Sequence, residues 1–215
     1  MSTALTSCAD DAENEEALAN DINQKLESMV RETLVGEHIL FTKVTVNGVD
    51  KTLLDGGCPT RLNFSWDGDS LVVAITDLKI GNMPFAISYQ STAAIRLLNH
   101  WEEDEHAGGN EAWFKFVGNN GSVSMGDGLK PNGASIKGYF HPGDNVIEFV
   151  IDYNVMNVRT VCERQMLDDP NVGDFDTEMA KYLEELAKYK RENGLDINVP
   201  SYDIDGPIYL DSIPS

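Results

Sequence analysis

Apolar and polar residues alternate most regularly between Ala134 and Met156. A segment with adjacent Pro and Gly, His141 to Asn145, interrupts the alternation, and such residues favour turns. The positions that share the apolar register are Ile136, Gly138, Phe140, Ile147, Phe149, Ile151, Tyr153 and Val155. A period of two is typical of a strand with one buried and one solvated face. The stretch therefore predicts an antiparallel β-hairpin.

Shorter segments with the same alternation occupy much of residues 38–162. Asn47-Gly48 lies between two apolar runs and predicts a type I′ hairpin, because both central residues of that turn need positive φ. Ala94 to Trp101 departs from the alternation and favours a short helix. The pattern predicts about eight to ten strands joined mainly by hairpin turns, which suits an up-and-down barrel or a two-sheet sandwich.

Two segments have helical periodicity instead. The first has apolar residues at Leu18, Ile22, Leu26, Val30 and Leu34, with Met29 beside them. The second runs from Thr177 to Asn193, with Met179, Leu183 and Leu186 in its stripe, Asp174 or Asp176 as its N-cap, and Lys188, Lys190 and Arg191 in its last turn. Caps of this kind satisfy free N–H groups, and cations suit the last turn. One apolar stripe on each helix indicates packing against the body of the domain.

These elements predict one β domain with extensions on both sides. We expect an acidic tether at 1–16, a helix at 17–36, a β-barrel at 37–165, and a helix with an extended tail at 166–215. A chain of 215 residues is long enough for one sizeable core. The apolar residues among 196–215 predict that the tail lies on the barrel or adds an edge strand.

The net charge of -20 is unusual, and it is spread along the chain. Residues 1–36, 37–162 and 163–215 contribute -6, -6 and -8. This distribution argues against a phosphate-binding surface for nucleic acid, which needs clustered Lys and Arg. An acidic mimic of nucleic acid stays open as an alternative, while solvated faces explain most surface acids.

The segment Leu5-Thr6-Ser7-Cys8 resembles a bacterial lipobox, in which two small residues precede the lipidated cysteine. Acidic residues follow Cys8, as in the tether of surface lipoproteins. This interpretation expects a basic region and an apolar region encoded in frame upstream of Met1. No apolar run in the chain is long enough to span a bilayer, so we expect membrane association only through the lipid. The alternative is an ordinary cysteine on a frayed terminus.

Two segments carry a resemblance to a known group of proteins. Asp77 to Ile87 is similar to a strand–turn–strand unit of the calycin-like lipoproteins of gut Bacteroidetes, and Ser135 to Tyr139 with Ile147 to Tyr153 is similar to their closing hairpin. The resemblance implies a lipocalin-like antiparallel β-barrel and no established activity. The chain departs from the pattern in an acidic insertion near residues 100–112 and in its C-terminal helix.

The remaining candidate sites are few. Cys58 and Cys162 flank the β region, and an exported protein could pair them in a disulfide; two separate buried thiols are the alternative. His100 and His106 bound a loop with four carboxylates, which gives weak candidates for a metal site. No catalytic motif and no cofactor motif is present.

The sequence favours an exported, lipid-anchored binding domain of the bacterial cell envelope, at the outer membrane or cell surface. We expect it to be a monomer without a cofactor and without nucleic acid, and its ligand to be a small apolar molecule, a glycan or another envelope protein. The alternatives are a cytoplasmic acidic inhibitor that mimics nucleic acid, and a hydrolase whose site is assembled from distant loops. A stop codon directly before Met1 would contradict the lipid anchor.

Overall fold

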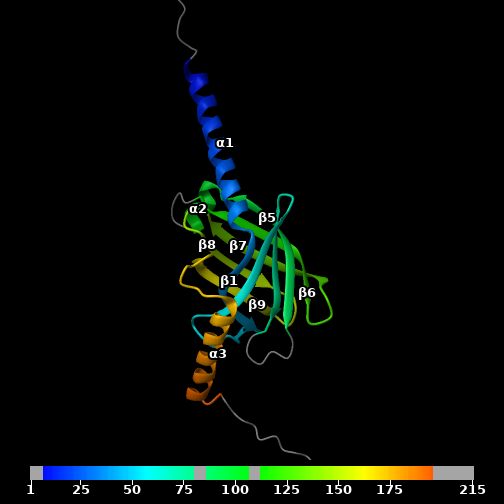
Figure 1. The fold of residues 1–215 in the computed structure, drawn as a ribbon. Coiled ribbons are helices and arrows are strands. Elements are labelled where there is room, and N and C mark those ends of the chain that lie inside the picture. Colours follow the sequence, from blue (N-terminus) through cyan, green and yellow to red (C-terminus); the bar gives the residue numbers. More distant parts are fainter. Residues whose placement is uncertain (1–6, 80–85, 107–111, 196–215) are drawn as a thin grey trace, which may run out of the picture.

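Eight antiparallel strands close into a β-barrel in the computed structural model of the chain (Figure 1). The structure describes residues 7–79, 86–106 and 112–195, and of residues 7–15 and 104 the backbone alone. The strands are β1 (Gly36–Val46), β2 (Val49–Asp50), β3 (Cys58–Asp67), β4 (Ser70–Leu78), β5 (Ile87–Leu97), β6 (Phe114–Ser124), β7 (Lys130–His141), β8 (Val146–Asp152) and β9 (Val158–Met166). The helices are α1 (Ser7–Thr33), α2 (His100–His106) and α3 (Phe175–Glu192). The predicted antiparallel barrel with an N-terminal and a C-terminal helix is confirmed.

The barrel is closed by its first and last strands. Lys43 to Val46 of β1 pair with Val158 to Val161 of β9, and the other barrel strands pair in chain order. This continuous pairing excludes the two-sheet sandwich. The short β2 only extends the end of β1, through a turn in which Asn47 and Gly48 have φ values of 51° and 77°. The expected closing role of the β7–β8 hairpin is wrong, because β7 already pairs with β6 on its other edge.

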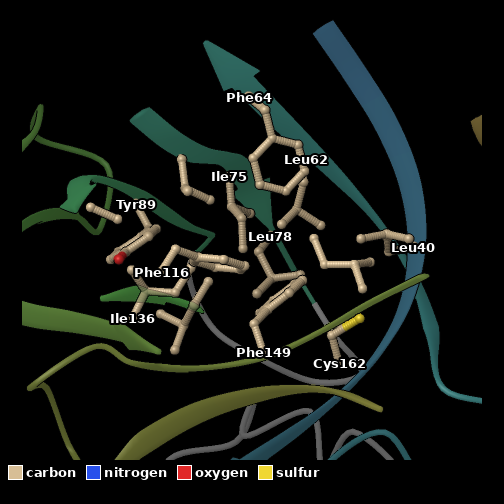
Figure 2. Close-up of a cluster of buried hydrophobic side chains, with 14 of the residues drawn as sticks. Leu40, Leu62, Phe64, Ile75, Leu78, Tyr89, Phe116, Ile136, Phe149 and Cys162 are labelled. Carbon is tan, nitrogen blue, oxygen red and sulfur yellow. The ribbon is translucent and has the colours of Figure 1, made fainter. Parts of the chain in front are cut away.

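The regular hairpin between Ala134 and Met156 is confirmed as β7 and β8, with Phe140 opposite Ile147. Its apolar register faces inward and joins a core to which every barrel strand contributes. Figure 2 shows part of this core. The largest fully buried aromatic side chains are Phe64, Tyr89, Phe116, Phe140 and Tyr153. These side chains occupy the interior of the barrel.

α1 covers one end of the barrel with its last turns and extends beyond it (Figure 1). Val30 and Leu34 are buried in the core. Arg31 donates to Asp69 in the β3–β4 turn at 2.6 Å and lies over the Trp66 ring at 4.6 Å. Further towards the N-terminus the predicted stripe leaves the barrel, and Leu18 is 60% exposed.

α1 begins at Ser7, so the tether expected at 1–16 is wrong for residues 7–16. This segment is rich in alanine and glutamate, which favour helix, and acids in the first turns suit the positive end of the helix dipole. Within the part of the chain that the structure describes, no helix has both the length and the apolarity to cross a membrane.

The short helix expected at Ala94 to Trp101 is wrong, because β5 continues to Leu97 and α2 begins at His100. Pairing of β5 with β6 overrides the local preference, as Ala94 lies opposite Val117. Two further expectations fall outside the described residues: the turn of the resemblance at 80–85 and the C-terminal tail at 196–215.

Candidate functional site

A groove of about 420 Å³ lies between α3 and the barrel wall at β3 and β4. We call it the α3 groove. Its apolar walls come from both sides and include Pro59, Ile75, Leu78, Phe175, Met179 and Leu186. Small-molecule sites typically have a few hundred cubic ångströms of mostly apolar space with few polar groups. The α3 groove has such a volume, and its lining surface is mostly apolar.

The first turn of α3 is fixed by side-chain caps. Asp174 accepts hydrogen bonds from the N–H and the hydroxyl of Thr177, each at 2.9 Å, and these bonds lower the pKa of Asp174. Glu178 accepts from the N–H of Gly173 at 2.9 Å. The predicted N-cap at Asp174 is therefore confirmed. The caps position Phe175 at the start of the helix, where it enters the groove.

The face that α3 turns to the barrel is centred on Tyr182 and Leu186, which are both buried. The hydroxyl of Tyr182 donates to the Thr52 carbonyl at 2.9 Å, and burial raises the pKa of Tyr182. The predicted stripe is wrong at Leu183, which is 53% exposed, while Met179 is only partly buried. These two apolar residues line the groove instead of filling the core.

The charges around the α3 groove are opposite to the charge of the chain. Arg61, Lys79 and Lys190 line it, with Asp77 as the acid among the described lining residues, although the net charge of the chain is -20. Arg61 is paired with Asp176, at 3.4 Å. Among the residues described, Lys79 and Lys190 have no acidic side chain within the 4.0 Å of an ion pair. The groove therefore combines apolar walls with two lysines that have no acidic partner among the described residues.

Cys58 lines the α3 groove from the barrel side, and Cys162 lies on β9. Both are free, buried thiols, and burial raises the pKa of each to about 12. Thr42 of β1 lies opposite Cys58, and β9 pairs with the other edge of β1. Two strand spacings of roughly 4.8 Å exceed the Cα separation that a disulfide allows. The predicted disulfide is therefore not formed in this structure, because β1 lies between the two cysteines.

A cluster of rings and charges holds the end of α2 against the outside of the barrel. The His106 ring stacks on Tyr139 with 3.8 Å between centroids and meets the Trp113 ring at 4.9 Å. Its Nε2 lies 3.4 Å from Glu148, which accepts from Nε of Arg164 at 2.8 Å. Burial lowers the pKa of His106, so the ring is neutral at pH 7. We call this the α2 cluster.

The residues predicted as sites are placed apart from one another. His100 and His106 lie at opposite ends of α2, in a helix rather than the expected loop. The residues that the structure describes include no group of three or more His, Cys, Asp or Glu side chains able to hold a metal ion. Cys8 is the second residue of α1, and its side chain is outside the described part.

Sequence reasoning missed Lys79, Lys190 and Met179 as residues of a site. Lys190 lies in the last turns of α3, where the helix dipole favours a cation whether or not a ligand is bound. Lys79 directly follows β4 and belongs to no sequence motif. Their common feature is that they line one groove from opposite sides, which only the packing of α3 on the barrel creates.

The fold defines the class of protein: a closed, eight-stranded antiparallel barrel with a helix over each end. Over residues 8–194 the chain matches the family described as Domain of unknown function (DUF4903), and it belongs to that family. No curated protein and no solved structure matches it. The match extends from α1 through α3, so the α3 groove lies within the family's domain.

Proposed function

We propose that this domain binds a small, largely apolar molecule in the α3 groove, at the end of the barrel that α3 covers. The observation that carries the proposal is the groove itself, about 420 Å³ of space with apolar side chains from both α3 and the barrel. Of the ligand classes expected from the sequence, a small apolar molecule fits these walls best, since a glycan would need more polar partners.

The packed interior supports a site at the end of the barrel rather than deep inside it. Small barrels are either filled by side chains or hold a ligand. Here Phe64, Phe116 and Tyr153 are among the large side chains that are fully buried in the interior. Val30 of α1 and Leu186 of α3 join the same core from the two ends. A ligand in the interior would have to displace this packing.

The groove is tested with the neutral fluorescent probe N-phenyl-1-naphthylamine. We expect saturable binding to the full chain. We expect Met179→Trp to weaken this binding at least tenfold, because the indole side chain is larger than that of methionine and fills the groove. Met156→Trp is the matched control, since Met156 is 51% exposed and away from the groove, and we expect it to bind as the unchanged chain does. Equal thermal unfolding of the variants excludes a folding defect. Lack of saturable binding, or full binding by Met179→Trp, would refute the proposal.

Export with lipid attachment at Cys8 completes the proposal. The family match begins at Cys8 itself, and the barrel agrees with the resemblance to calycin-like lipoproteins. In a host that processes lipoproteins, expressed with its upstream coding sequence, the chain is expected in the membrane fraction and Cys8→Ser in the soluble fraction. The same distribution for both would leave Cys8 without this role.

A further inference from the structure

We infer that the molecule bound in the α3 groove is an amphiphile with an acidic head, such as a fatty acid, whose head is bound by Lys79 and Lys190. This inference rests on the proposed function and names the chemical class of the ligand. It follows from the charges of the groove, because its shape and apolar walls alone would accept a neutral molecule equally well.

In the part of the chain that the structure describes, few cations lack an acidic partner, and two of these line the groove. Of the sixteen Lys and Arg residues, five have no acidic partner within 4.0 Å in the described structure. They are Lys51, Lys79, Lys137, Lys190 and Arg191. The 36 acidic residues of the chain outnumber its 16 Lys and Arg residues more than twofold, so most of these cations have an acidic partner. Two unpaired lysines on one apolar groove therefore need an explanation.

The two lysines approach the groove from different elements. Lys79 directly follows β4, and Lys190 lies in the last turns of α3. Asp77, the acid among the described lining residues, already accepts a hydrogen bond from Ser88. Arg61 is held by Asp176 and by Glu37. Among the described residues that line the groove, the charges without an acidic partner are therefore those of the two lysines.

An acidic head group suits this arrangement for physical reasons. An anionic head forms charge-assisted hydrogen bonds with ammonium groups, which are stronger than those between neutral groups. The alkyl chain of the same ligand would lie along Phe175, Met179 and Leu183, whose apolar surface is still accessible to water. Because the whole chain repels anions, recognition depends on this local pair of cations rather than on long-range attraction.

The experiment uses three ligands that share a ten-carbon chain: decanoate, decanol and decyltrimethylammonium. The two ions are titrated below their micelle concentrations, and decanol below its solubility limit, into the full chain loaded with N-phenyl-1-naphthylamine. We expect decanoate to displace the probe at a concentration about tenfold lower than decanol, and decyltrimethylammonium to be the weakest. Lys79→Glu and Lys190→Glu should each raise the decanoate concentration about tenfold and leave decanol unchanged. Lys51→Glu and Lys137→Glu are matched controls, because these lysines are unpaired but lie elsewhere, and they should change nothing.

The outcomes distinguish a failure of this inference from a failure of the proposed function. If the three ligands displace the probe equally, the groove binds apolar molecules and the acidic head is refuted. If the probe itself does not bind, the proposed function fails as well. If a synthetic peptide of residues 196–215 displaces the probe and decanoate does not, the occupant is the acidic tail of the chain, and the inference is overturned. Equal losses in the groove variants and the controls would also contradict it.

Discussion

Gly138 is a position in the barrel wall where no side chain can be accommodated. In the register of β6 and β7 it lies opposite Phe116. A Cβ built on Gly138 would lie 2.7 Å from the Glu148 carbonyl oxygen and closer still to the Phe116 ring. The ring thus covers the place that a side chain would take. Gly138→Ala is expected to lower the free energy of unfolding by about 2–3 kcal/mol, as overpacking does, measured by urea denaturation.

Gly56→Ala is the matched control for this substitution. A Cβ at Gly56 meets nothing within 4 Å, and its backbone is outside the left-handed region. We expect its stability to remain within about 0.5 kcal/mol of the unchanged chain. If Gly138→Ala were as stable as this control, Phe116 would have to move freely, and the packing described for the interior would be wrong.

At the scale of elements, one side chain extends the contact between β1 and β9 beyond their paired residues. Beyond Lys43 the two strands no longer pair. There Gln165 accepts from the Phe41 N–H at 2.9 Å and donates to the Phe41 carbonyl at 2.8 Å. Gln165→Ala leaves both groups without this partner and is expected to cost about 1–2 kcal/mol of stability. Hydrogen exchange of the Phe41 amide should accelerate more than that of other β1 amides.

Gln90→Ala is the control for the seam, since Gln90 is an exposed residue on the paired strand β5. In the Gln90→Ala variant, the β1 amides should exchange at the same rates as in the unchanged chain. Slow exchange at Phe41 in Gln165→Ala would mean that β1 stays in place at Phe41 without the glutamine.

The elements also show how far local pattern predicts this fold. Alternation in the hairpin of Ile136 and Ile151, and the Asn47-Gly48 turn, are local signals, and the structure confirms both. The closure of β1 on β9 joins residues more than a hundred positions apart, and no local signal encodes such a pairing. Pairing with β6 also determines the conformation of Ala94. Its neighbours favour a helix, but Ala94 lies in strand β5.

The candidate site was less predictable than the strands for the same reason. Lys79 and Lys190 are ordinary residues at the ends of a strand and a helix, and the groove exists only where α3 meets the barrel. The apolar stripe predicted for α3 was close to the observed one. A small rotation of the helix nevertheless decides whether Met179 fills the core or lines a groove. Cys58 and Cys162 illustrate the converse, since residues that chemistry would pair are separated by one intervening strand.

For the whole molecule, the buried titratable groups predict loss of stability in alkali. Burial raises the pKa of Cys58 and of Cys162 from 9.0 to about 12, and that of Tyr89 from 10.0 to about 12. Above pH 9 the unfolded thiols lose their protons while the folded ones keep them, so unfolding becomes more favourable as pH rises. The contribution of these groups to the free energy of unfolding is therefore complete below pH 9. It falls between about pH 9 and 12, by about 2 kcal/mol for each thiol at pH 10.5.

Urea midpoints at pH 8 and 10.5 measure this fall. Cys58→Ala with Cys162→Ala should make the decrease shallower, because the two thiols then no longer contribute. A midpoint that stays constant up to pH 10.5 in the unchanged chain would show that the two thiols are not buried as the barrel requires.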